Sequence, residues 1–187
     1  MAEVRSEILI TPEAVASFLN VFRPNPKQKT KDGRPKYTLT LIFKPAAQKT
    51  AGFKALKKAV EDVAHEKWGD ELPKKLKRPF LTTDDLEKVP TGLDEEDVFI
   101  RLSAINKPGI VDQKKAPILD EGDMYAGCFI RCSVQAYTWV DEQGGKGVSF
   151  GLNNIQKVRD GDHLAGGSRA EDDFDELEVA DTDDLLD

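Results

Sequence analysis

The sequence predicts a mainly β (α+β) fold in which five strands and one intervening helix form a small barrel or sandwich. Two periodicities predict it: several runs alternate apolar and polar residues, as half-buried strands do, and one run repeats apolar residues at helical spacing. At 187 residues and 39% hydrophobic content, the chain is long enough to bury one core. We therefore expect one domain, residues 1–167, and a disordered acidic tail, residues 168–187.

The first two predicted strands form a hairpin. They cover Ala16–Phe22 and Lys36–Lys44, and the second alternates large apolar residues with Lys and Thr. The intervening residues 23–36 combine prolines, a glycine and bases, which is typical of a long, mobile loop. This segment is the densest positive region of the chain, with Arg23, Lys27, Lys29, Lys31, Arg34 and Lys36.

One helix follows this hairpin. Thr50 is a suitable N-cap and Gly69 a suitable stop for a helix over residues 51–68. Its apolar stripe is Phe53, Leu56, Val60, Ala64 and Trp68. Residues 70–97 then mix Pro, Lys and acids without a sustained period, so we expect a long surface excursion there.

Three more strands complete the predicted barrel: Val98–Ile105, Tyr125–Val140 and Lys146–Gln156. A turn at Lys107-Pro108-Gly109 and a tight hairpin at residues 141–145 separate them. Along residues 125–140, every second side chain is small or branched and mostly apolar, as a barrel interior requires. The last strand carries no comparable pattern and mainly closes the barrel.

The opposite faces of two of these strands carry aromatic rings beside cations. Residues 125–140 interleave four rings with Arg131, and residues 99–107 place Phe99 beside Arg101 and Lys107. Such a surface suits unstacked bases and their phosphates, each base–ring stack contributing roughly 1–3 kcal/mol. A duplex hides its base faces, so the pattern predicts binding of single strands on one continuous platform. The alternative is a second buried layer of rings, covered by the 70–97 excursion.

The formal net charge of -7 is a property of the tail. Residues 168–187 contain ten of the 34 acids and one of the 27 Lys and Arg residues, which leaves the first 167 residues at +2. A flexible anionic segment on a basic body competes with another polyanion for the same surface. We therefore expect the tail to inhibit nucleic-acid binding.

Other classes of protein find little support in the sequence. Cys128 and Cys132 lie four residues apart in a strand, which favours buried reduced thiols over a disulfide or metal site. His65 and His163 form no catalytic constellation. No apolar run reaches the roughly 20 residues that span a bilayer, so we expect a soluble, cytoplasmic protein. The acids between Asp84 and Asp97 leave a metal-dependent nuclease open as one alternative.

Several motifs resemble those of tailed-phage single-stranded DNA-binding proteins. They are FLNVFRP at residues 18–24, GRPKY at 33–37, KPG at 107–109, YAGC at 125–128 and KGVSFGLNNIQKVRDG at 146–161. The resemblance covers roughly residues 6–166 and implies an OB-fold, an acidic C-terminus and a role in phage DNA replication or recombination. The chain departs from many replication proteins at its end, which lacks a terminal aromatic residue.

We thus predict a protein, not an enzyme, that coats single-stranded DNA without sequence preference in the infected host's cytoplasm and needs no cofactor or metal. A replication protein–protein interaction module is the other alternative. The predicted stacking residues are Tyr37, Phe99, Phe129, Tyr137 and Trp139. The predicted phosphate contacts are Arg23, Lys27, Lys29, Lys31, Arg34, Lys36, Arg101, Lys107 and Arg131. The tail residues that would dock a replication protein are Phe174, Asp183, Asp184, Leu185, Leu186 and Asp187. The oligomeric state stays open.

Overall fold

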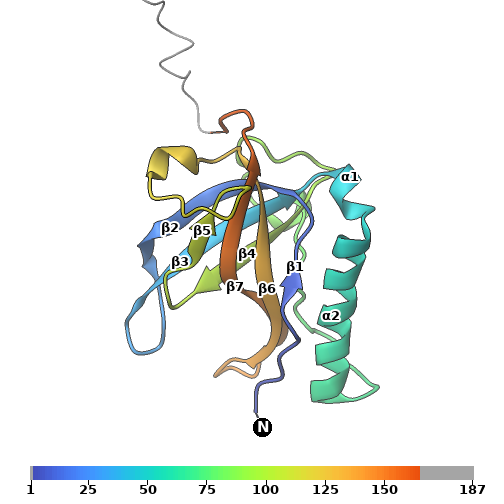
Figure 1. The fold of residues 1–187 in the computed structure, drawn as a ribbon. Helices are drawn as coiled ribbons and strands as arrows, with labels where there is room; N and C mark the ends of the chain where they lie inside the picture. Colours follow the sequence, from blue (N-terminus) through green and yellow to red (C-terminus); the bar gives the residue numbers. More distant parts are fainter. Residues whose placement is uncertain (1, 165–187) are drawn as a thin grey trace, which may run out of the picture.

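A computed structural model describes residues 2–164 of the protein (Figure 1). The tail, including the six residues predicted to dock a partner, lies outside this range. Two short 3-10 helices, Thr83–Asp85 and Glu121–Asp123, accompany the main elements. These elements are β1 (Leu9–Ile10), β2 (Ala14–Lys29), β3 (Pro35–Phe43), α1 (Pro45–Gln48), α2 (Ala51–Trp68), β4 (Val98–Ala104), β5 (Gly109–Val111), β6 (Phe129–Val140) and β7 (Lys146–Arg159).

Five of the strands close into a barrel, which confirms the predicted mainly β fold. Around the barrel the order is β2, β3, β4, β7 and β6, and β6 pairs back with β2. The β4–β7 pair is parallel and the other four pairs are antiparallel. β1 extends the edge of β6, and β5 extends the edge of β7. Closure into a five-stranded barrel agrees with the OB-fold that the resemblance implies.

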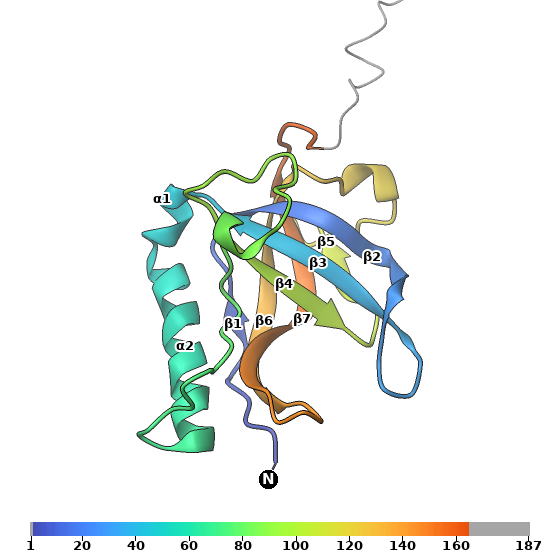
Figure 2. The same cartoon turned by 180° about the vertical axis from the view of Figure 1, so that it is seen from behind.

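The predicted helix is present and covers one side of the barrel (Figure 2). Thr50 caps α2, since its hydroxyl accepts a hydrogen bond from the Phe53 amide at 3.2 Å, and Gly69 ends the helix with φ 80°. The buried stripe of α2 packs on β6 and β7. Phe53 contacts Phe43 and Phe80 edge to face, at centroid distances of 5.1 and 5.6 Å. The rings thereby join α2 to the barrel core.

The 70–97 segment differs from the predicted surface excursion because part of it belongs to the barrel wall. β4 and β7 pair directly only around Leu102 and Ser103. Where they diverge, residues 77–81 fill the gap: Lys77 pairs with Gly147 of β7 and Leu81 pairs with Phe99 of β4. This role could not be predicted from the sequence, because the segment is rich in polar residues and two isolated bridges leave no periodic pattern.

The hairpin between β2 and β3 also differs from the prediction. Residues 23–36 were expected to form a long loop, but β2 continues to Lys29 and β3 begins at Pro35. Only the tip, residues 30–34, is a turn, closed by the Thr30 amide donating to the Arg34 carbonyl at 2.8 Å. Irregular register along β2 accommodates Pro24 and Pro26, since prolines cannot donate to a regular ladder. The bases therefore stand on a two-stranded ribbon.

The inward and outward faces of β6 are as predicted from residue 129 to residue 139, whereas Val140, predicted to face the core, is 50% exposed at the end of the strand. Its core face is buried, including Ile130, Cys132 and Val134, while the residues between them are partly or fully exposed. Cys128 and Cys132 are free, buried thiols, as expected. Burial raises the pKa of both thiols. Within residues 2–164, no helix has both the length and the apolar character needed to cross a membrane.

Candidate nucleic-acid interface

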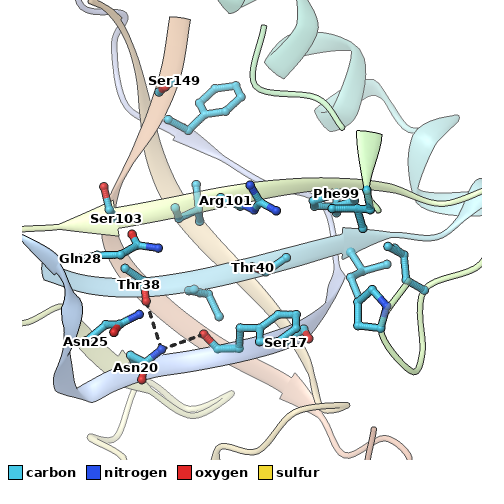
Figure 3. A pocket seen from close by; sticks show the side chains of 18 of the residues that line it. Ser17, Asn20, Asn25, Gln28, Thr38, Thr40, Phe99, Arg101, Ser103 and Ser149 are labelled. Carbon is cyan, nitrogen blue, oxygen red and sulfur yellow. Dashed lines mark hydrogen bonds between the residues drawn. The ribbon is translucent and has the colours of Figure 1, made fainter. Parts of the chain in front are cut away.

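A groove of about 760 Å³ crosses the outer face of β2, β3 and β4 (Figure 3). Residues 86–93 form a further part of its wall, and Tyr137 and Ser149 extend it to β6 and β7. Figure 3 shows the side chains of Thr38 and Thr40 on β3 lying between those of β2 and β4. On an OB-fold, the face of the second and third barrel strands is the usual site for oligonucleotides. Those strands are β3 and β4 here.

Strand register arranges the groove floor in rows of hydrogen-bonding groups. One row runs from Ser17 through Thr40 to Arg101, which are paired in register across β2, β3 and β4. The next row contains Asn20, Thr38 and Ser103. The Asn20 amide donates to the Thr38 hydroxyl at 3.2 Å, so the floor is ordered by its own side chains.

Tyr137 joins β6 to this floor. It pairs with Ser149 on β7, and its ring lies across Gly151, where a β-carbon would come within 3.8 Å of it. Burial raises the pKa of Tyr137 although hydrogen bonds with Ser149 and Ser103 oppose the shift, so the phenol stays neutral at physiological pH. Tyr137 thus brings a ring from β6 next to the β4 row.

The groove is positively charged. Among the described residues that line it, none is Asp or Glu, whereas Arg101 and Lys88 are both exposed. The Arg101 guanidinium lies 5.6 Å from the centroid of the Phe99 ring. By strand alternation, Lys36 shares the groove face of β3 with Thr38 and Thr40. A polyanion can therefore enter without meeting a carboxylate on the walls.

The predicted bases of the hairpin lie along the β2–β3 ribbon beside the groove. Lys27 and Lys29 are exposed, and the same ribbon contributes Asn25 and Gln28 to the groove wall. Three of the bases contact acids at the surface: Arg23 with Glu121 at 3.3 Å, Arg34 with Asp32 at 2.9 Å and Lys31 with Glu142 at 3.8 Å. The last contact joins the tips of the β2–β3 and β6–β7 hairpins. Such exposed pairs are weak, and phosphates can replace them.

The structure separates the two strand faces that were predicted to form one continuous platform. β7 lies between β4 and β6, so the two predicted faces meet only through Tyr137. Arg131 points to another part of the barrel surface, where its guanidinium donates to Gln156 at 2.7 Å. Lys107 lies beside the Phe22 ring, at 5.9 Å from its centroid. The idea of one continuous surface over both strands was therefore wrong.

The predicted stacking rings lie in different environments. Phe99 is 3% exposed, because it belongs to an outer cluster with Val15, Ile42 and Leu93. Leu81 and Leu86 also cover this cluster, so the alternative of a buried ring layer applies to Phe99. Phe99 consequently offers the groove little free ring surface.

The other rings each have a protein neighbour. The Arg159 guanidinium lies over the Phe129 ring, with its carbon 3.6 Å from the ring centroid. The Trp139 indole donates to the Ser149 hydroxyl at 2.9 Å and packs on Gly147. Tyr37 shares the core-side face of β3 with Leu39, which is buried. Of the five predicted rings, the groove contains Phe99 and Tyr137.

Most groove residues, apart from Phe99, Arg101 and Tyr137, were not among the predicted site residues, and three of those missed contribute exposed apolar or charged side chains. Phe18 is 60% exposed and Val89 48% exposed, and both line the groove with Lys88. Phe18 was counted within a regular strand, although residues 15–19 do not alternate between apolar and polar side chains. That break in alternation was the available signal. Lys88 and Val89 lie in a segment without periodicity and left no signal.

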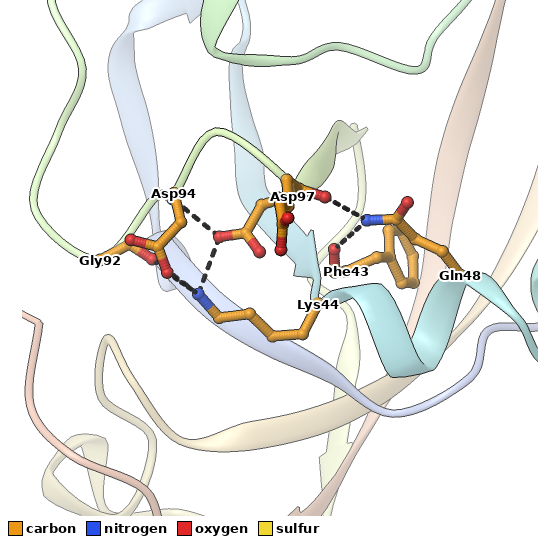
Figure 4. Close-up of polar contacts among 7 residues, drawn as sticks. Phe43, Lys44, Gln48, Gly92, Asp94 and Asp97 are labelled. Carbon is orange, nitrogen blue, oxygen red and sulfur yellow. Dashed lines mark hydrogen bonds and ion pairs between the residues drawn. The ribbon is translucent and has the colours of Figure 1, made fainter.

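Three carboxylates of the nuclease hypothesis, those of Asp85, Asp94 and Asp97, have partners within the protein (Figure 4). The Lys44 ammonium contacts Asp97 at 2.7 Å and Asp94 at 3.1 Å, and Asp97 also accepts the Asp94 amide. Partial burial lowers the pKa of Lys44, but its bonds to Asp97 and Asp94 outweigh this effect and raise the pKa overall. Asp85 caps the 3-10 helix at Thr82. Within residues 2–164, no group of three or more His, Cys, Asp and Glu side chains is placed to hold a metal ion.

The barrel and its groove define a nucleic-acid-binding OB-fold protein. Comparison with known proteins narrows the class. The chain belongs to the family of the Enterobacter phage Enc34 ssDNA-binding protein, whose family model matches residues 7–186.

Relatives by sequence and by fold are also phage proteins. Putative protein p50 of Acyrthosiphon pisum secondary endosymbiont phage 1 is 27% identical over 178 residues, covering 91% of this chain and 94% of that protein. The single-stranded DNA-binding protein from bacteriophage Enc34, solved in complex with ssDNA, has a TM-score of 0.64 at 15% identity, covering 85% of this chain and 89% of that one. The gp2.5 single-stranded DNA-binding protein of bacteriophage T7 has a TM-score of 0.55 at 14% identity, covering 88% and 98%. At these identities, the two solved structures establish the shared fold.

Proposed function

We propose that this protein binds single-stranded DNA without sequence preference, through the groove over β2, β3 and β4. The observation that carries the proposal is a groove with exposed cations and a floor of hydroxyl and amide groups, and without acids among its described lining residues. A flexible single strand fits such a channel because its phosphates meet cations while its bases meet rings. The family to which the chain belongs supports this ligand.

The role that follows is coating and protection of transient single strands during phage DNA replication or recombination, in the cytoplasm of the infected bacterium. Sequence-independent binding suits this role, since every nucleotide has a phosphate and a flat base. The hydroxyl and amide rows of the floor accept any base edge. We propose a binding role and no catalytic one.

We further propose that the acidic tail regulates DNA binding. The last described residues lead toward the groove: Leu164 packs on the outer cluster that contains Phe99 and Leu93, and both of these line the groove. A tail tethered at this point has an effective concentration on the order of mM. Its ten carboxylates compete with DNA for the groove and the β2–β3 ribbon, or dock a replication protein when DNA displaces them.

A fluorescence titration tests the proposed function. Oligo-dT and a blunt duplex of equal length are titrated into the full chain over a range of salt, with Trp emission as the signal. Single strands should bind more tightly, and log K should fall with log salt by about 0.7 for each phosphate contacted. Equal affinity for single strands and duplex, or a dissociation constant for oligo-dT that does not change with salt, would falsify the proposal.

A further inference from the structure

Phe18 combines two unusual properties at the wall of the groove. Its side chain is 60% exposed, and its backbone has φ 46°, in the left-handed region. A bulky residue rarely adopts this conformation, because its β-carbon then crowds the backbone. Such strain persists only where the surrounding structure enforces it, and it gathers at functional sites.

The surrounding contacts enforce the conformation through a bulge in β2. The register with β3 shifts between Ser17, paired with Thr40, and Asn20, paired with Thr38. The Asn20 amide holds the bulge by contacting the Phe18 carbonyl at 3.4 Å and the Thr38 hydroxyl (Figure 3). A bulge re-aims the side chains at its position. Here it turns a phenyl ring out of the barrel and into the groove.

Packing inside the protein does not explain why position 18 has an aromatic side chain. Within residues 2–164, Phe18 belongs to neither hydrophobic cluster, whereas its neighbour Leu19 packs against the main core. Val89 supplies a second exposed apolar side chain to the same groove from the 86–93 loop. The groove therefore has free apolar surface above a polar floor, which is the environment that a flat base with polar edges requires.

We propose that Phe18 forms a stacking subsite for one unpaired nucleobase and sets the preference of the groove for single over double strands. The inference rests on the proposed function. In a duplex, both faces of each base are covered by neighbouring base pairs, so the ring has no face to stack on. Arg101 and the ribbon lysines contact phosphates, which both kinds of DNA present. The Phe18 ring thus raises the affinity for single strands relative to that for duplex DNA, whereas the cations raise the affinity for both.

Two substitutions with equal backbone strain isolate the ring. Phe18→Leu removes the aromatic face, while Phe18→Trp keeps one, and both retain a β-carbon at the strained position. Dissociation constants are measured for oligo-dT and for a duplex at one salt concentration. Phe18→Leu should weaken oligo-dT binding by roughly ten- to a hundredfold, the equivalent of one base–ring stack, and leave duplex binding unchanged. Phe18→Trp should retain the wild-type ratio.

Controls distinguish a failure of this inference from a failure of the proposed function and from misfolding of the variants. Leu119→Ala removes an apolar side chain that is 86% exposed and outside the groove, and it should not change either affinity. Phe18→Gly removes ring and strain together, so it should match Phe18→Leu in affinity with a thermal midpoint no lower than wild type. If Phe18→Leu keeps the wild-type ratio, or weakens both ligands equally, Phe18 is not the selective subsite. If wild type fails to bind oligo-dT, the proposed function itself is wrong.

Discussion

Arg101 is the residue on which the charge of the groove depends most directly. It lies at the β4 end of the row that begins at Ser17, and within residues 2–164 it forms no ion pair. We expect Arg101→Ala to weaken oligo-dT binding about tenfold, since a hydrogen bond to a charged group contributes about 1.5 kcal/mol. The salt slope should also fall by about 0.7.

Arg131 provides a matched control for this substitution. It is an exposed arginine of the same barrel, but it bonds to Gln156 away from the groove. Arg131→Ala should therefore leave the affinity and the salt slope unchanged. An equal loss for both variants would mean that DNA binds by the overall charge of the barrel and not in the groove.

Local patterns predicted which side chains point outward but not which of them are free. Alternation correctly assigned Arg101 to the outer face of β4 and Tyr137 to that of β6. Phe99 has the same orientation as Arg101, yet Leu86 and Leu93 cover it from a segment without periodicity. Whether an outward ring is free depends on residues distant in sequence. Phe18 escaped prediction for a related reason, because a bulge has no fixed period.

At the scale of elements, the barrel depends on a segment that is neither helix nor long strand. Residues 77–81 bridge β4 and β7 where the two strands diverge. The Lys77 amide donates to the Lys146 carbonyl at 3.0 Å, and its carbonyl accepts from the Val148 amide at 2.9 Å. Phe80 fixes this segment to the core, at 5.8 Å from the Phe150 ring centroid. The five strands and α2 were predictable from periodicity, whereas this closure depends on pairing between distant residues.

Phe80→Ala tests the importance of this segment. The substitution removes a partly buried ring that contacts Phe53 and Phe150, so we expect the free energy of unfolding to fall by about 3 kcal/mol. Urea denaturation followed by far-UV circular dichroism measures the change. Leu119→Ala, at an exposed position, should stay within about 0.5 kcal/mol of wild type. A loss as small as that of the control would show that residues 77–81 are not needed to close the barrel.

At the scale of the whole molecule, the distribution of charge matters more than its sum. The chain has a net charge of -7, but its bases concentrate in the first 60 residues, where twelve bases face four acids. The structure places six of those bases on β2, the hairpin tip and β3, beside a groove without acids among its described lining residues. The negative charge is concentrated after residue 170. The proposed competition between DNA and tail would therefore take place on this positive surface.

Removing residues 171–187 tests this competition. The deletion takes away ten acids and no base, which changes the net charge from -7 to +3. We expect oligo-dT to bind more tightly to the truncated chain, because the groove and ribbon no longer have a tethered competitor. The gain should be greatest at low salt and shrink as the Debye length falls from ~30 Å at 0.01 M to ~8 Å at 0.15 M. A full-length variant with the ten acids replaced by Asn and Gln separates charge from tail length, and it should behave like the truncation. If the neutral variant binds as wild type does, the acids do not compete with DNA, and the tail acts through a replication protein alone.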